Sequence, residues 1–127
     1  MGLSTEDRLD IQQLYARYNH AIDSGDGAGW AATFTPDGTF KSGPIDLAGT
    51  EALAQFGGSL AARMKPRHWT NNLVIDEAPG GAKGSCYLML HNLSGEKPAV
   101  AATGIYRDEL AKTPDGWRFK ARMVQPD

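Results

Sequence analysis

The chain has 127 residues, of which 41% are hydrophobic and 22% charged, and its formal net charge is −2. This length and composition predict one soluble domain over residues 1–127 and argue against extensive disorder. Basic and acidic residues are interspersed and no apolar run reaches the ~20 residues of a membrane span, so neither nucleic acid nor a membrane is expected as a partner.

Residues 5–24 have the pattern of an amphipathic helix. Ser4 or Thr5 can cap its start and Gly25 can end it. Its apolar face is formed by Ile11, Leu14, Tyr15, Tyr18 and Ile22, with Leu9 as a weaker member. A short second helix is predicted over residues 26–34. The sequence TPDG at 35–38 then predicts a turn, followed by a short strand over 38–43.

A third helix is predicted within residues 48–66, with Thr50 as its N-cap and Pro66 as its end. Its apolar stripe consists of Leu53, Phe56, Leu60 and Met64. Gly57 and Gly58 lie in the middle of this helix and each costs about 1 kcal/mol relative to alanine. Close packing or a bend is therefore expected at this pair.

Four β-compatible runs follow, over residues 67–76, 82–93, 99–113 and 116–125, and turn signals separate them. In the last run, Trp117, Phe119, Ala121 and Met123 alternate with Arg118, Lys120 and Arg122, which predicts one dry face and one wet face. Three helices combined with this run of strands predict an α+β fold. The expected shape is a cone-shaped barrel, in which a curved antiparallel sheet wraps around the first helix.

Asp23 and His68 are the two polar residues that most need an explanation. Asp23 lies at the edge of the apolar stripe in the last turn of the first helix. The helix alone favours a solvent-exposed Asp23 that caps the following turn. His68 begins a strand and shares a face with Thr70 and Asn72. A strand histidine taken alone is more often structural than catalytic, whereas the pair could also meet as a dyad.

In such a dyad the carboxylate would orient the imidazole, and the second ring nitrogen would act as a general base. Tyr18, with Asn72 or His91 as further candidates, would donate hydrogen bonds to an oxygen or leaving group. His20 lies opposite the apolar stripe and is expected to be exposed. The histidines show no metal-binding spacing, Cys86 has no ligand partner nearby, and no nucleotide-binding or serine-hydrolase motif occurs. No metal site is therefore expected, and nucleotide-driven chemistry has no support.

Several stretches resemble the SnoaL-like group of the nuclear transport factor 2-like superfamily: IQQLYARYNHAIDSGDGAGWAATFTPDGTF, LAGTEAL, RHWTNNLVID and TGIYRDELAKTPDGWRFKARMV. The resemblance covers about residues 5–125. It implies a curved sheet around a cavity that the N-terminal helices cap. In scytalone dehydratase, bile-acid dehydratase and hexachlorocyclohexane dehydrochlorinase of this superfamily, an Asp–His pair works without a cofactor. Asp23 and His68 match that pair, and Tyr18 resembles the tyrosine of the bile-acid dehydratase.

The resulting hypothesis is a cofactor-independent lyase or isomerase in the cytoplasm, with His68, Asp23 and Tyr18 as catalytic residues. Dehydration of a small hydrophobic, polyketide-, steroid- or aromatic-like substrate is the first choice, followed by isomerisation and cyclisation. The alternative is a non-catalytic ligand carrier or a structural small subunit such as those of ring-hydroxylating dioxygenases. The expected substrate-binding residues are Asn72, Tyr87, His91, Trp30, Phe56, Trp117 and Phe119.

The outer face of the sheet is expected to carry Trp69, Leu73 and Ile75. An exposed apolar sheet face usually finds a partner, so this face could form a homodimer or homotrimer.

Overall fold

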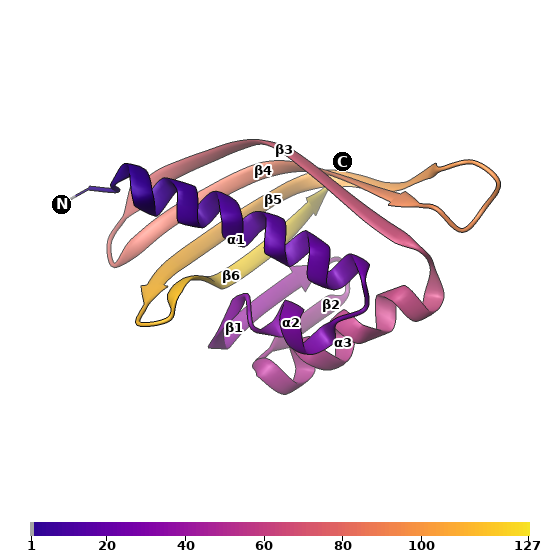
Figure 1. Ribbon diagram of the computed structural model, residues 1–127, viewed down its shortest axis with the longest axis horizontal. Coiled ribbons are helices and arrows are strands. Elements are labelled where there is room, and N and C mark those ends of the chain that lie inside the picture. The colour runs from indigo at the N-terminus through magenta and orange to yellow at the C-terminus, as the bar shows by residue number, and fades with distance from the viewer. Residues whose placement is uncertain (1) are drawn as a thin grey trace.

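The computed structural model describes residues 2–127 and contains three helices and six strands within them. Helix α1 lies across one face of the sheet, and α2 and α3 pack side by side near β1 and β2 (Figure 1). The elements in chain order are α1 Thr5–Asp23, α2 Gly27–Ala31, β1 Phe34–Ser42, β2 Ile45–Ala48, α3 Thr50–Arg63, β3 Pro66–Ala78, β4 Gly81–Asn92, β5 Ala99–Thr113 and β6 Gly116–Pro126.

Helix α1 begins and ends where the sequence predicts. Ser4 is the N-cap, and its hydroxyl and the Asp7 carboxylate exchange hydrogen bonds with each other's backbone N–H in a capping box. Gly25, just beyond the helix, adopts a φ of 77°, which glycine tolerates without strain. Five of the six predicted apolar positions of the helix are buried, whereas Leu9, the weaker member, is 58% exposed. His20 is exposed, as expected.

The second and third helices are shorter than predicted, but their packing follows the expectation from the glycine pair. Asp26 caps α2 by accepting a hydrogen bond from the Gly29 N–H. A Cβ at Gly57 would lie 2.7 Å from Cε3 of Trp30, so only glycine lets α3 approach this indole. The N-cap prediction for α3 was wrong by one residue: Gly49 is the cap, and Thr50 is the first helical residue.

The sheet is mixed rather than purely antiparallel, and it stays open, with strand order β2-β1-β6-β5-β4-β3. Strand β1 runs parallel to β6, and β2 pairs with β1 as a short hairpin partner that the sequence did not predict. The predicted turn at 35–38 was wrong. These residues belong to β1, where the register with β6 shifts between Phe34 and Thr39. The curved sheet with α1 against one face still forms the cone-like α+β fold.

Two register shifts reverse the faces that simple alternation predicts. In β3 the shift falls between Asn71 and Val74, where Asn72 has a φ of 56°. Leu73 and Ile75 consequently pack against the core, and Val74 is exposed in their place. The expectation that Leu73 and Ile75 lie on the outer face was therefore wrong, because one extra residue in a bulge exchanges the two faces.

Strand β6 contains the second reversal. Phe119 pairs with Leu110 of β5, but Ala121 pairs with Glu109, so Lys120 is the extra residue. Arg122 is therefore buried with 1% of its surface exposed, while Met123 is 46% exposed. The predicted dry and wet faces of this strand hold before Lys120 and are inverted after it.

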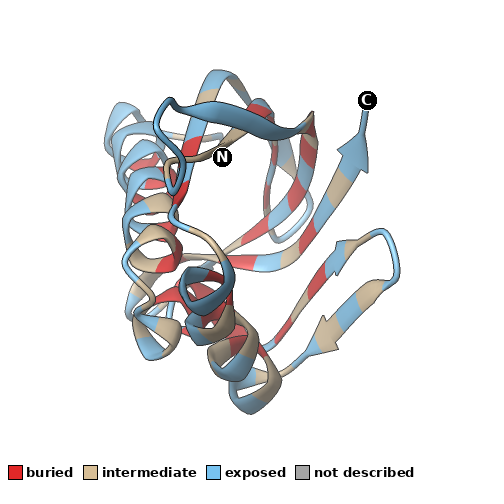
Figure 2. Ribbon diagram, turned by 90° about the vertical axis from the view of Figure 1, so that its right-hand side faces the viewer, coloured by how far each residue is buried: buried red, intermediate tan, exposed pale blue. Residues whose placement is uncertain are grey.

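The core lies between the helices and the concave face of the sheet, and Figure 2 shows buried segments on both sides of it. Its centre is aromatic, since Tyr18, Trp30, Phe34 and Phe119 pack with ring centroids 5.1–6.0 Å apart. Edge-to-face and tilted arrangements of this kind add to the hydrophobic gain from burial. Within residues 2–127, no helix has the length and apolar character needed to span a membrane.

Candidate active site

The structure brings Asp23 and His68 into contact where α1 ends and β3 begins. Asp23 Oδ1 lies 2.5 Å from Nδ1 of His68, and the His68 backbone N–H donates to both carboxylate oxygens at 3.2 and 3.0 Å. The side chains are 14% and 6% exposed, respectively. Asp23 is thus not a solvated helix cap. Its carboxylate holds both the backbone and the ring of a single residue on another element.

The regular repeats of helix and strand place these groups together. One turn before Asp23, the Asn19 Nδ2 donates to Thr70 Oγ1 at 3.1 Å. The four helical residues from Asn19 to Asp23 advance about 6 Å, and the two strand residues from Thr70 to His68 advance about 7 Å. The two distances are similar, so both pairs can form at once. The last turns of α1 therefore run along the free edge of β3, which is the terminal strand of the sheet.

The hydrogen bond from Nδ1 fixes the chemical form of the His68 ring. A carboxylate can only accept, so Nδ1 carries the proton, and in the neutral ring Nε2 keeps a free lone pair. Among the residues that the structure describes, no hydrogen bond involves Nε2. This is the arrangement required of a histidine general base: one nitrogen is oriented and the other is available. Within residues 2–127, no three His, Cys, Asp or Glu side chains gather as metal ligands.

A surface cleft of about 800 Å³ borders the dyad. One wall is the last two turns of α1 with Ser24, and the other is the segment 65–70 at the start of β3. The residues lining it are Ala16, Asn19, His20, Asp23, Ser24, Lys65, Pro66, Arg67, His68, Trp69 and Thr70. Most of these residues are polar or charged, so a ligand there would meet hydrogen-bonding groups as well as the apolar surface of residues such as Trp69.

Tyr18 lies in the aromatic core and is fully buried. Its ring packs against Trp30, Phe34, Tyr106 and Phe119. None of the hydrogen bonds made by Asp23 or His68 in the described chain involves Tyr18. Tyr18 also does not line the cleft that borders the dyad.

Tyr18 instead belongs to a buried polar cluster that sequence reasoning missed. Arg122 Nε lies 3.0 Å from Oδ1 of Asp108, and Tyr15 donates its phenolic proton to the other Asp108 oxygen. The guanidinium carbon sits 3.3 Å from the centroid of the Tyr106 ring and 4.3 Å from that of Tyr18. The sequence offered one signal for this cluster. Asp108 alternates in phase with the apolar Tyr106 and Leu110 of β5, and a carboxylate on a buried face needs a positively charged partner.

Burial dominates the electrostatics of this cluster. It raises the pKa of Asp108, although Arg122 and the Tyr15 hydroxyl act in the opposite direction. Burial lowers the pKa of Arg122, but the Asp108 carboxylate and the surrounding tyrosines raise it more, so this guanidinium stays charged. Burial also raises the pKa of the Cys86 thiol to about 11, which keeps it protonated at neutral pH.

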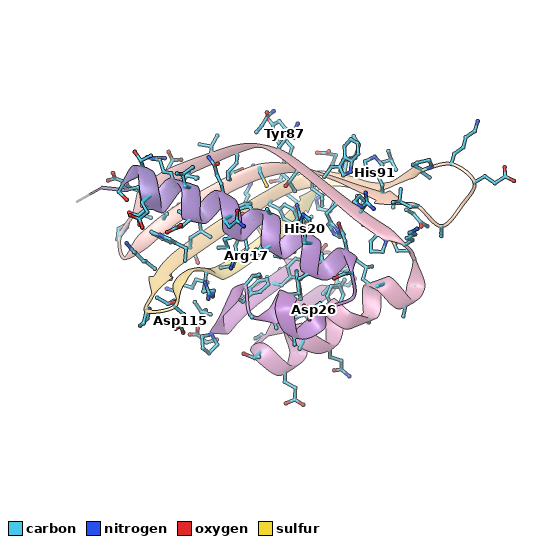
Figure 3. The ribbon with its side chains drawn as sticks, viewed as in Figure 1. Arg17, His20, Asp26, Tyr87, His91 and Asp115 are labelled. Carbon is cyan, nitrogen blue, oxygen red and sulfur yellow. The ribbon has the colours of Figure 1, made fainter. Side chains whose placement is uncertain are left out.

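Three of the predicted substrate-binding residues lie away from the interior. Tyr87 is 52% exposed on the outer face of β4, and His91 of the same strand stacks on Trp69 with ring centroids 4.7 Å apart (Figure 3). Asn72 is exposed at the bulge of β3. These residues cannot line a cavity between sheet and helices, because alternation in β4 and the bulge in β3 direct them outward.

The four predicted aromatic residues are core residues in this closed structure. Trp30, Trp117 and Phe119 are at most 4% exposed, and Phe56 packs partly buried against Trp30 and Phe40. Trp117 donates its indole N–H to Asp7 at 3.1 Å. None of these four residues lines the cleft that borders the dyad.

The sequence and the fold both match those of known proteins. Residues 4–123 match the model of the SnoaL-like domain. A variant of Rv3472, a protein of unknown function from Mycobacterium tuberculosis, is 31% identical, with 94% of this chain and 70% of that one covered and a TM-score of 0.89. Aln2 from a Streptomyces species is 30% identical, with 100% and 95% covered and a TM-score of 0.88.

A protein from Catenulispora acidiphila, solved in complex with S-DNPA, is 29% identical, with 98% and 96% covered and a TM-score of 0.86. No curated protein matches the sequence. Other solved structures with this architecture have an NTF2-like, cystatin-like fold. The chain therefore belongs to the SnoaL-like family.

Proposed function

We propose that this protein is a cofactor-independent lyase or isomerase in which His68 removes a proton from carbon, with dehydration as its reaction. The observation that carries the proposal is the Asp23–His68 pair, in which the carboxylate orients the ring and Nε2 is left for substrate. A histidine held in this way is suited to general acid–base work near neutral pH.

In the proposed reaction, Nε2 takes a proton from the carbon next to a carbonyl. The electrons of that C–H bond form a double bond as hydroxide leaves from the neighbouring carbon. The imidazolium, which the Asp23 carboxylate stabilises, then returns the proton to the leaving oxygen, so that water is released and the histidine is again neutral. Isomerisation would use the same first step and return the proton to a different carbon.

Tyr18 is proposed to donate a hydrogen bond to the substrate oxygen that gains charge or departs. Tyr18 is completely buried, and Trp30 and Phe34 pack against its ring. Neighbouring elements must therefore move before Tyr18 can contact a substrate. Opening of the α2–α3 pair would expose Tyr18 and the aromatic rings beside it. The complex of the Catenulispora acidiphila relative with S-DNPA supports small-molecule binding by this protein.

The exposed apolar side chains favour an additional, non-catalytic role for the sheet. Six of the seven exposed large apolar residues within residues 2–127 are on β3–β6: Trp69, Val74, Tyr87, Met89, Val100 and Met123. A homodimer or homotrimer through this face would cover them, and a larger subunit would do the same. Sedimentation of the wild type and of Tyr87→Asp should show an assembly that the substitution dissociates, and a monomeric wild type would contradict self-association.

The experiment for catalysis compares wild type, His68→Ala, Asp23→Asn and the control Asp46→Asn on a set of small β-hydroxy-carbonyl compounds and enones. Asp46 is exposed on β2 and makes no contact with the cleft. We expect turnover by wild type and Asp46→Asn, and loss of turnover in the two dyad variants, with their fold and ligand affinity retained. Full activity in His68→Ala would refute the proposal.

A further inference from the structure

The cleft that borders the dyad is more basic than the chain as a whole. Lys65 and Arg67 both line it, whereas Asp23 is its one acidic residue and is already engaged by His68. Neither cation takes part in a salt bridge within the described residues. Since the whole chain has a net charge of −2, this local excess of positive charge has to arise from the placement of these residues.

Beside the cations, the free edge of β3 offers hydrogen-bond donors. The His68 N–H points away from β4, because it donates to Asp23 of α1. Amides along a strand alternate in direction, so the Thr70 N–H faces the same edge, on the side of α1. The Thr70 hydroxyl accepts from Asn19 and keeps its own proton for donation. Thr70 therefore presents two donors, two residues along the strand from the catalytic candidate.

We propose that this part of the cleft binds a carboxylate group of the substrate, so that the substrate class is a hydroxy acid or an oxo acid. The inference rests on the proposed function and adds to it a recognition site at Thr70, in a cleft that Lys65 and Arg67 make electropositive. A carboxylate accepts hydrogen bonds from an amide and a hydroxyl, and cations elsewhere in the cleft attract its negative charge. Bound there, it sets the adjoining carbon chain against Nε2 of His68.

Binding can be tested without turnover by titrating naphthalene-2-carboxylate and its uncharged analogue, naphthalene-2-carboxamide, into ¹⁵N-labelled protein. The two probes have the same ring and nearly the same shape, so their difference reports the charge. We expect the carboxylate to shift the Thr70 amide and the His68 ring signals and to bind about tenfold more tightly than the amide. Added salt should reduce that preference, because the cations are exposed.

The matched variants are Lys65→Gln and Lys120→Gln, since Lys120 is exposed on β6 outside this cleft. Lys65→Gln should weaken carboxylate binding severalfold and leave carboxamide binding unchanged, while Lys120→Gln should change neither. Equal binding of both probes, no response at the Thr70 amide at millimolar carboxylate, or an unchanged preference in Lys65→Gln would each overturn the inference.

The two proposals can fail separately. Charge-selective binding at Thr70 in a protein that turns over no hydroxy acid would support the carboxylate site and count against the lyase. Turnover of hydroxy-carbonyl esters at a rate equal to that of the matching acids, lost in His68→Ala, would support the lyase and overturn the carboxylate site.

Discussion

The two ends of helix α1 each carry a carboxylate that reaches across to the sheet, and the two have different consequences. At the N-terminal end, Asp7 accepts from the Ser4 backbone N–H, the Lys112 ammonium at 2.9 Å and the Trp117 indole at 3.1 Å. At the C-terminal end, Asp23 accepts only from the backbone and ring of His68.

The difference lies in what the partners can do with a proton. The amide, ammonium and indole groups that donate to Asp7 keep their protons at neutral pH. The hydrogen bonds at this end of the helix therefore stabilise the fold and do not transfer protons. The imidazole paired with Asp23 can both accept and donate a proton through its second nitrogen, and His68 lines a cleft. The same carboxylate chemistry therefore acts as an anchor at one end and supports a candidate base at the other.

The largest effect on stability should come from neither end but from the middle of α1, where Arg122 lies beneath Tyr15 and Tyr18. Arg122→Met removes the cation and leaves Asp108 buried without its ion-pair partner, which should cost about 3–5 kcal/mol of unfolding free energy. Urea unfolding measures this loss. The double variant Arg122→Met/Asp108→Leu should recover most of it, and a loss below about 1 kcal/mol in the single variant would show that the pair is not needed.

A smaller loss is expected from the contact between α2 and α3. Gly57→Ala places a methyl group against the Trp30 ring, and forcing it into a packed core should cost about 1–3 kcal/mol. Gly58→Ala is the control, because the nearest atom to a Cβ there is 3.9 Å away. Equal thermal midpoints for the two variants would show that α2 and α3 can shift apart at little cost in stability. Such a shift would also make the aromatic core easier to open.

Asp23→Asn should change the state of His68 more than the stability of the fold. The asparagine oxygen can still accept from the His68 backbone N–H, so we expect a stability loss of about 1 kcal/mol or less. Its amide can also donate to Nδ1, so the fraction of the ring protonated at Nδ1 should fall, which ¹⁵N chemical shifts of the imidazole report. An unchanged tautomer would show that Asp23 does not orient the ring.

Asp7→Asn gives the smallest expected effect, and pH reveals it. The Lys112 ammonium, with Ser4 and Trp117, holds the pKa of Asp7 well below its ordinary value of 3.8. Such a group stabilises the fold above its unfolded pKa, and the contribution is lost as the pH falls below about 3.8 toward the folded value. Wild type should therefore lose stability over this acid range more steeply than Asp7→Asn. Parallel curves for the two proteins would show that the Lys112 pairing contributes nothing.

Local patterns in the sequence were sufficient to predict several elements. The α+β class, the bounds of α1 and the four long strands follow from apolar periodicity, capping residues and turn signals, all of which act over a few residues. The close packing at Gly57 was predicted because a glycine inside a helix has a local cost that needs a reason. The match of Asp23 and His68 to a known pair came from resemblance, since spacing alone left them as a cap and a structural histidine.

Only the tertiary structure decided which polar groups meet. One inserted residue at Asn72 and one at Lys120 reversed the faces of β3 and β6, which sent Leu73 and Ile75 inward and buried Arg122. No local pattern predicts such bulges, because their cost is met by contacts with strands and helices far away in the sequence. For the same reason, the absence of Tyr18 from the cleft that borders the dyad and the position of His68 beside Lys65 and Thr70 emerge only when α1 is set against the edge of β3.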